Sequence, residues 1–225
     1  NYPMFAGNKI SSLRINPSGT SYAFIDNKKD KNSVDVYSLI YKDTRQGKVG
    51  TTKLFKPLAI CYSPDAKFLY VMGSDKKIHI YTTRKTQEVK NFDVNETASR
   101  LDASPNGFFL IASSANKIQV INMENQSVRT TIDLKAELKD IAFSSNSKQM
   151  AVLTADGTCD VYDTKTFKVS KHFDAMGIAE KCYFHPENKY LAIVTGEQRV
   201  ALLNLLNDDD RQYIDAKDAG IKYIN

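Results

Sequence analysis

The 225-residue sequence has no tryptophan, three cysteines, three histidines and six prolines. No apolar run approaches the ~18 residues needed to cross a bilayer, so we expect no transmembrane segment. A Gly-rich phosphate loop and a dinucleotide-binding fingerprint are both absent, which removes the usual sequence signs of nucleotide chemistry. The remaining composition is 42% hydrophobic and 25% charged, with a net charge of +5. This composition is typical of one globular domain, and the chain is long enough to fold without disulfides.

The few cysteines and histidines do not form a pattern that indicates a reactive site. The cysteines are odd in number and lack metal-type spacing, so we expect them to be small buried side chains. The histidines fall in different segments of the repeat described below, which argues against a shared metal or a catalytic triad. These residues are Cys61, Cys159, Cys182, His79, His172 and His185. We therefore predict no catalytic, cofactor-binding or metal-binding residues.

Residues Pro57–Asp93 show the pattern on which the rest of the chain is built. Four short strands, at 58–63, 67–73, 77–82 and 88–92, alternate with turns. Each strand with its turn takes about ten residues, which is too short for a crossover helix. Consecutive strands must therefore pair as antiparallel neighbours.

The same unit recurs along the chain in two independent registers. The first register is a dipeptide after each first strand, namely Asn16-Pro17, Ser63-Pro64, Ser104-Pro105, Ser144-Ser145 and His185-Pro186. The second is a bulky residue in each third strand, namely Tyr37, Tyr81, Ile121, Tyr162 and Leu203. Both repeat with a period of about 41 residues. We predict that the five third-strand residues are structurally equivalent and buried.

This period and its internal pattern indicate one architecture. Units of about 40 to 45 residues with four strands each are typical of β-propeller blades. Apolar residues alternate with a period of two in the first strands, whereas the second strands are almost wholly apolar. We therefore predict an all-β fold, a β-propeller of four-stranded antiparallel blades whose core lies between blades. The first-strand residues expected at these interfaces are Leu13, Ile15, Ile60, Tyr62, Leu101, Ala103, Ile141, Phe143, Cys182 and Phe184.

The repeats predict a single propeller domain over residues 1–225. Their boundaries fall at about 8–54, 55–93, 94–133, 134–174 and 175–217. The first repeat is longer, and we expect its extra residues in two loops, Asp26–Asn32 and Ile40–Gly50. Residues 219–225 match the first strand of the first repeat and predict the start of a sixth unit, while residues 1–5 match an outer strand. The sequence thus predicts a piece of a longer chain, either a closed five-bladed ring with tails or part of a larger ring.

The repeated segments carry a family resemblance. SPDAKFLYVMGSDKKIHIY, SPNGFFLIASSANKIQVIN and HPENKYLAIVTGEQRVALLN resemble WD-repeat and YVTN-type propeller blades, in which a Ser-Pro-Asp-Gly turn precedes an apolar strand. The Trp-Asp and Gly-His signatures of WD repeats are missing. The resemblance therefore implies a divergent blade, similar to those of bacterial envelope proteins, and a fold that hosts many functions.

Lysines gather in segments predicted to emerge on one face of such a fold, at the turns between second and third strands and at the links between repeats. They are Lys28, Lys29, Lys31, Lys76, Lys77, Lys117, Lys135 and Lys139. Acidic residues are interspersed, so we expect a mixed face that is basic overall. Exposed aromatic residues do not alternate with the lysines, which disfavours nucleic acid. An acidic protein or peptide is the better expectation for a partner.

Three functional hypotheses remain open at this stage. We favour a non-enzymatic protein-interaction or ligand-binding propeller without a cofactor, from a bacterial periplasm or cell envelope. The second hypothesis is a cytoplasmic scaffold of eukaryotic type. The third is a lactonase-like or quinoprotein-like propeller enzyme, for which Asp102, Asp140 and Glu180 lie near first strands but in different registers.

Overall fold

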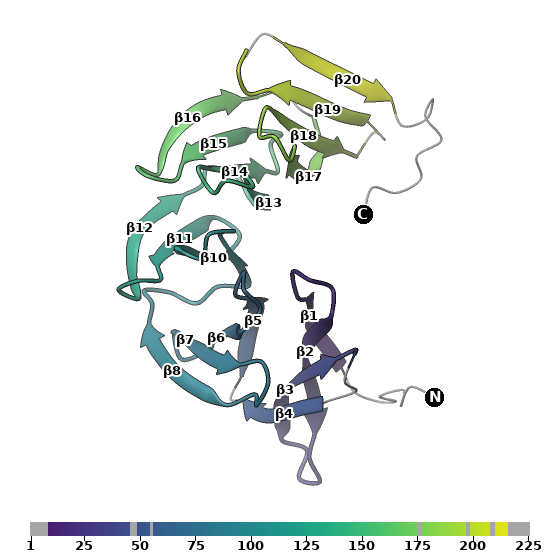
Figure 1. Cartoon of the computed structure of the whole chain (residues 1–225), viewed down its shortest axis with the longest axis vertical. Helices are drawn as coiled ribbons and strands as arrows, with labels where there is room; N and C mark the ends of the chain where they lie inside the picture. The colour runs from purple at the N-terminus through teal and green to yellow at the C-terminus, as the bar shows by residue number, and fades with distance from the viewer. Residues whose placement is uncertain are drawn as a thin grey trace. The chain divides into compact units, whose positions relative to one another are not determined.

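The computed structural model describes residues 9–45, 49–54, 56–174, 177–196, 199–207 and 210–215. All regular structure in these ranges is β-strand, arranged in five four-stranded antiparallel sheets (Figure 1). In every sheet the strands pair in chain order, as the short turns require. The all-β class and the antiparallel meander are therefore confirmed. The predictions for residues 1–5 and 219–225 lie outside the described residues.

The chain divides into two compact units. The first comprises residues 1–114 and 119–131, and the second comprises residues 115–118 and 132–225. Within the described chain, no helix is long and apolar enough to cross a membrane. The single propeller domain stays a prediction.

Three sheets belong to the first unit, apart from the first two residues of β11 and the last two of β12. Sheet 1 contains β1 (Lys9–Ile15), β2 (Ser21–Lys29), β3 (Asp35–Asp43) and β4 (Val49–Leu54). Sheet 2 contains β5 (Pro57–Tyr62), β6 (Phe68–Gly73), β7 (Lys77–Thr82) and β8 (Glu88–Asp93). Sheet 3 contains β9 (Arg100–Ala103), β10 (Phe109–Ser113), β11 (Lys117–Asn122) and β12 (Ser127–Asp133).

Two further sheets lie in the second unit. Sheet 4 contains β13 (Leu138–Phe143), β14 (Gln149–Thr154), β15 (Cys159–Asp163) and β16 (Lys168–Phe173). Sheet 5 contains β17 (Ala179–Phe184), β18 (Tyr190–Thr195), β19 (Arg199–Asn204) and β20 (Arg211–Asp215). The fourth strands β8 and β12 are mostly exposed, whereas the second strand β6 and the third strand β11 are mostly buried.

In the first unit, sheet 2 is covered on both faces. Tyr62 and Leu69 pack in one cluster with residues of sheet 1, whereas Tyr70 and Met72 pack in another cluster with residues of sheet 3. Successive side chains of a strand point to opposite faces, so a sheet covered on both sides needs apolar residues at consecutive positions. The first strands of neighbouring sheets are also in contact, β1 with β5 and β5 with β9. The predicted core between sheets is confirmed here.

Sheets 4 and 5 pack in the same way within the second unit. Leu153 and Val161 share one cluster with Leu191 and Ile193, and β17 contacts both β13 and β14. A polar bridge accompanies these contacts, because the backbone N–H of buried Cys182 donates to the Asp140 carboxylate at 3.1 Å. A buried carboxylate that accepts such a bond avoids most of the cost of desolvation.

Two of the predicted interface residues, Leu13 and Ile15, are exposed instead. Their exposed fractions are 53% and 68%, whereas Ile60 and Tyr62, at the same repeat positions, are buried. Ile60 and Tyr62 face the preceding sheet, sheet 1. No described sheet precedes sheet 1, so nothing in the described chain covers the corresponding face of β1.

The predicted equivalence of the third-strand residues is confirmed for four members and wrong for Tyr37. Tyr81, Ile121, Tyr162 and Leu203 are all buried. Tyr37 is half-buried and pairs with Asn27, far along the hairpin from the turn that starts β2. The residue that corresponds to Tyr81 by strand pairing is Lys42, because Tyr22 pairs with Lys42 as Leu69 pairs with Tyr81.

The two loop insertions predicted for the first repeat are also corrected. Asp26–Lys29 belong to β2, so only the end of the predicted loop is a turn. Most of Ile40–Gly50 is regular structure as well, since β3 continues to Asp43 and β4 begins at Val49. The turn between them has the usual length, because Lys42 pairs with Val49 as Tyr81 pairs with Glu88. The extra residues of the first repeat therefore lengthen one hairpin, β2–β3.

We expect Tyr162→Ala to lower the free energy of unfolding by ~3–5 kcal/mol, because truncation of a buried aromatic side chain leaves a cavity. Tyr37→Ala is the matched comparison, since Tyr37 is only half-buried and should cost less. Chemical denaturation of both variants measures the difference. Equal losses in the two variants would contradict the corrected register.

We expect Gly157→Ala to be strongly destabilising for two reasons. Gly157 has a φ of +81°, and an added Cβ would lie 2.5 Å from the Gly177 carbonyl oxygen. Left-handed backbone alone costs about 1–2 kcal/mol for a residue with a Cβ, and the backbone clash adds to it. Gly19→Ala is the control, because its φ is +68° but no atom lies within 4 Å of the added Cβ. Thermal unfolding should show a clearly larger loss for Gly157→Ala.

Candidate functional site

The five predicted lysines of the first unit lie around two turns between second and third strands. Lys28 and Lys29 end β2, Lys31 lies in the turn that follows, Lys76 lies in the β6–β7 turn and Lys77 begins β7. Two of them have partners: the Lys29 Nζ donates to the Ser33 carbonyl at 3.3 Å, and Lys77 pairs with Asp93 at 3.5 Å.

The three predicted lysines of the second unit are largely engaged in ion pairs. Lys117 begins β11 and lies 3.9 Å from Asp133, and Lys139 lies in β13, 3.4 Å from Glu137. Lys135 is exposed in the link before β13. Exposed ion pairs of this kind contribute only about 0–1 kcal/mol to stability, so these lysines can still bind an acidic group of a partner.

The β2–β3 hairpin continues past the described parts of β1 and β4, its neighbours in sheet 1. Lys28 pairs with Val36 and Lys29 with Asp35, whereas the last β2 residue paired to β1 is Asn27. A polar turn closes the hairpin, because the Asp30 carboxylate accepts the backbone N–H groups of residues 32 and 34 at 2.8 and 2.9 Å. We call residues 28–36 the hairpin tip. Its exposed groups include Lys28, Lys31 and the apolar Val34.

The three histidines lie in or beside three different sheets. His79 is buried in sheet 2, where its Nδ1 lies 2.9 Å from Glu88 and its Nε2 lies 3.2 Å from Asp75. His172 lies 2.7 Å from Asp160 in sheet 4. The His185 ring accepts the backbone N–H of Glu187, so this histidine stabilises its own turn. In the described part of the chain, no group of three or more His, Cys, Asp or Glu side chains could hold a metal ion.

The acidic residues considered for an enzyme also have structural partners or lie exposed. Asp102 pairs with Arg100 at 2.6 Å in the first unit. Asp140 accepts from Cys182 and lies 3.5 Å from Lys181 in the second unit, where Glu180 is exposed.

All three cysteines are buried, as predicted, and they form no disulfide in the described part of the chain. Burial raises the pKa of the Cys61 thiol well above its ordinary value and that of Cys159 to about 12. Because the thiolate is the reactive form, neither thiol is prepared for nucleophilic chemistry.

A common turn geometry joins the first and second strands in all five sheets. The fourth residue of each turn has a left-handed backbone, with φ between 57° and 74°. Its N–H donates to the carbonyl of the first turn residue at 2.7–2.9 Å. These fourth residues are Gly19, Ala66, Gly107, Ser147 and Asn188. The side chains at the second and fourth positions are therefore free to vary over one fixed backbone.

Side chains at these two positions tie sheet 4 to sheet 5. The Ser145 backbone N–H and hydroxyl donate to the Asn188 side chain and to the Pro186 carbonyl, at 2.8 and 2.9 Å. The Asn188 amide in turn donates to the Ser145 hydroxyl at 2.9 Å. Ser145 occupies the second position of its turn and Asn188 the fourth position of the next.

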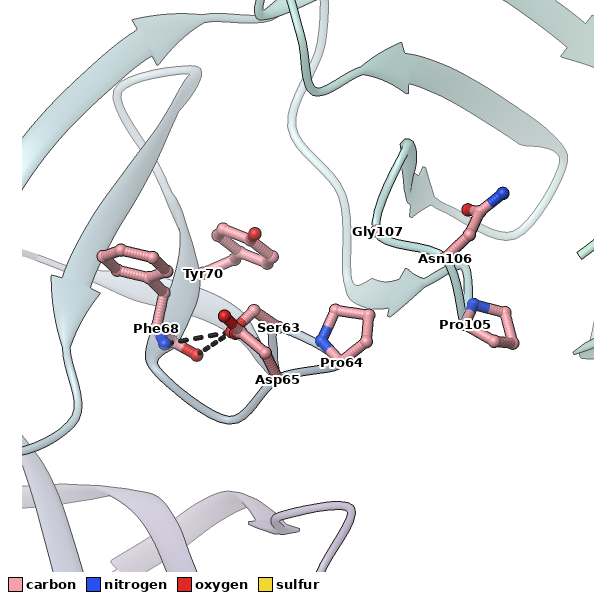
Figure 2. Close-up of a pocket in the computed structure, with 8 residues that line it drawn as sticks. All are labelled: Ser63, Pro64, Asp65, Phe68, Tyr70, Pro105, Asn106 and Gly107. Carbon is pink, nitrogen blue, oxygen red and sulfur yellow. Dashed lines mark hydrogen bonds between the residues drawn. The ribbon is translucent and has the colours of Figure 1, made fainter.

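Proline and glycine replace this pair between sheets 2 and 3. Pro64 stands at the second position and has neither an N–H nor a hydroxyl, while Gly107 stands at the fourth position and has no side chain. The turns are therefore not tied there, and a cleft of about 480 Å³ opens between them. Figure 2 shows it between the turn residues 63–65 and 105–107, with the rings of Phe68 and Tyr70 at its side. We call it the Pro64–Gly107 cleft.

The cleft combines apolar walls with two polar groups. Tyr70 is 8% exposed, and its hydroxyl makes no hydrogen bond with the described residues. Burial raises the Tyr70 pKa to about 12, and Cys61 and Asp65 add to the rise, so the hydroxyl keeps its proton. For Asp65, partial burial raises the pKa, but hydrogen bonds from the Ser63 hydroxyl and the Lys67 backbone lower it by more. The pKa of the Asp65 carboxyl therefore lies below its ordinary value. The carboxylate is therefore ionised at neutral pH.

Sequence reasoning did not find this cleft. It located the Ser-Pro turns but used them only as markers of the repeat. The available signal was the pair of positions at which the aligned turns differ, Pro64 and Gly107 against Ser145 and Asn188.

The Glu88 carboxylate predicts a pH effect on stability. Burial raises its pKa, but hydrogen bonds from Asn91, His79 and Tyr81 lower it by more, so the folded pKa lies below the ordinary 4.5. A lowered folded pKa gives stability that is present above the ordinary value and is lost as pH falls through the folded value. Glu88→Gln should therefore be less stable than wild type at pH 6, and the difference should shrink between pH 4.5 and pH 2. Urea unfolding at each pH tests it, with exposed Glu124→Gln as the control; a constant difference would contradict the linkage.

Comparison with other proteins does not place the chain in a family. No family model matches the sequence, and no curated protein shows significant similarity to it. The interpretation of the site therefore depends on its own geometry.

Proposed function

We propose that this chain forms a divergent β-propeller of the WD-repeat or YVTN kind and acts as a non-enzymatic protein-interaction module. The support for the fold is the packing of neighbouring sheets within each unit, in which first strands are adjacent and alternate side chains serve the preceding and the following sheet. Radial packing of blades in a propeller has this geometry. Ring closure is part of the proposal.

The hairpin tip is the observation that carries the interaction role. It continues past the described ends of β1 and β4, and its turn is held by the Asp30 side chain. Lys28 and Lys31 are exposed and have no hydrogen bond or ion pair with the described residues. Lys76, in the corresponding turn of sheet 2, is also exposed and has no hydrogen bond or ion pair with the described residues. Rigid scaffolds that project loops in this way commonly bind partners through them.

The partner best suited to this surface is an acidic protein. Its carboxylates would meet the three lysines, and an apolar side chain would meet Val34, which is 58% exposed. Electrostatic complementarity of this kind speeds association and makes it sensitive to salt.

The test compares two charge-matched variants of the full chain. Lys28→Glu, Lys31→Glu and Lys76→Glu are combined in one variant. The control combines Lys85→Glu, Lys90→Glu and Lys168→Glu, three exposed lysines elsewhere on the strands and turns. Proteins captured from an extract of the source cells are identified by mass spectrometry, and the affinity of each specific partner is then measured at low and at high salt.

We expect the first variant to bind at least about tenfold more weakly and the control to bind as wild type does. Circular dichroism and thermal unfolding should show that both variants are folded, because all six positions are exposed. Capture that is equally strong for wild type and the first variant, and unaffected by salt, would rule out the hairpin tip as the docking surface.

A further inference from the structure

We propose that the Pro64–Gly107 cleft binds an arginine side chain presented by a polypeptide. This site is separate from the hairpin tip, and the proposal does not depend on the function proposed for the tip. It would add a second, cation-selective binding site to the first unit.

The cleft exists because of two residues rather than because of general looseness. The backbone of the Ser104–Gly107 turn is the same as that of the turn that contains Asn188, including the left-handed fourth residue. The nearest atoms to a Cβ on Gly107 would be those of the Pro64 ring, at 3.9 Å. The cleft is thus bounded by preformed turns, so binding a ligand would cost no free energy for rearranging them.

The Tyr70 hydroxyl is the first polar group that the cleft offers to a ligand. Tyr70 lies on β6 with its ring at the cleft, as Figure 2 shows, and its hydroxyl has no hydrogen bond with the described residues. A ligand in the cleft could therefore bond to this hydroxyl without displacing any protein partner. The phenol oxygen can accept a hydrogen bond from a cation, while its own proton remains available as a donor.

The Asp65 carboxylate decides the sign of the ligand charge. Its Oδ1 accepts from the Ser63 hydroxyl at 2.7 Å and from the Lys67 N–H at 3.1 Å, which fixes the carboxylate at the edge of the cleft. Its Oδ2 lies 3.3 Å from the Lys67 Nζ. Both side chains of this pair are largely exposed, so the pair is weak and a ligand cation can replace the Lys67 ammonium.

The walls of the cleft favour guanidinium over other cations. The rings of Pro64 and Pro105 offer apolar surface to an aliphatic stem, and Phe68 and Tyr70 offer aromatic faces. A guanidinium group stacks on such faces and carries five donors, so it can bind a carboxylate and a hydroxyl at once. An ammonium group is a more strongly hydrated point charge and gains less from these surfaces.

The experiment titrates isotopically labelled full-length protein with two small probes. The first probe is the blocked tripeptide acetyl-Gly-Arg-Gly-amide, and the second has citrulline in place of arginine, which keeps the shape but removes the charge. Backbone amide chemical shifts report both affinity and location. We expect the arginine peptide to shift the amides of Lys67 and Gly107 and to bind at least about tenfold more tightly than the citrulline peptide.

Two single variants test the polar groups, and both keep the fold. Asp65→Asn retains an oxygen that can accept the turn hydrogen bonds, as Asn106 and Asn146 do in the equivalent turns. It should reduce binding of the arginine peptide to the level of the citrulline peptide. Tyr70→Phe removes only the hydroxyl, which has no partner to lose, and should weaken binding by about fivefold.

A third variant closes the cleft by introducing, between sheets 2 and 3, the hydrogen bonds that link the turns of sheets 4 and 5. Pro64→Ser combined with Gly107→Asn introduces the same side chains as Ser145 and Asn188, and Gly107 already has the left-handed backbone of Asn188. This double variant should be as stable as wild type or more stable, and it should not bind the arginine peptide. Asn146→Asp is the matched control, because it adds the carboxylate to the turn that is already tied, and it should gain no binding.

Several results would overturn the proposal. They are equal binding of the two peptides, unchanged binding in Asp65→Asn, binding that survives closure of the cleft, and shifts confined to the hairpin tip. Loss of the acidic partner after reversal of Lys28, Lys31 and Lys76, with arginine binding intact, would support both sites. Failure of the tip experiment alone would leave the cleft proposal standing, since its readout is local to the Pro64–Gly107 cleft.

Discussion

The two-sided burial of each interior sheet is the constraint on which the rest of the structure depends. Sheet 2 places alternate side chains against sheet 1 and sheet 3, so its second strand is apolar at every buried position from Leu69 to Met72. Polar chemistry is thereby excluded from most of the strand faces. It appears where a strand ends or where a polar group has a fixed partner, as Asp140 has in Cys182. Binding functions in such a fold must be built on the turns.

The turns meet this requirement with a constant backbone and variable side chains. A left-handed fourth residue and one short backbone hydrogen bond define each first turn, whether the residue is Gly107, Ser147 or Asn188. What differs is whether neighbouring turns bind one another. Ser145 and Asn188 do so, whereas Pro64 and Gly107 leave a cleft. A site can therefore be opened or closed by two substitutions that leave the scaffold unchanged, which is why the closing variant is a stringent test of the geometry.

The strands could be predicted from the sequence because their apolar pattern and their 41-residue period express the same packing requirement. The prediction failed where residues of the same type do not occupy the same position in the strand pairing. Tyr37 resembles Tyr81 in type, but Lys42 occupies the equivalent place, and the lengthened β2–β3 hairpin shifted the register. The cleft could not be predicted from one repeat, because it depends on which side chains face each other across two turns about 41 residues apart in the sequence. Neighbouring sheets had to be placed before Pro64 and Gly107 could be compared with Ser145 and Asn188.

A cation site on a chain of net charge +5 requires that the lysines not oppose it. Lys67 lies at the cleft, in an exposed pair with Asp65 that a ligand can replace, and sheet 2 shows why the lysine at its far end has little effect. Lys76 lies beyond one end of β6 and Ser63–Asp65 beyond the other, and the six residues of β6 span ~20 Å at about 3.3 Å per residue. Charges in solvent are screened over ~8 Å at physiological ionic strength, so the charge of Lys76 contributes little at the cleft. The local carboxylate of Asp65 then determines the sign of the ligand, and the two ends of one rigid sheet can serve ligands of opposite charge.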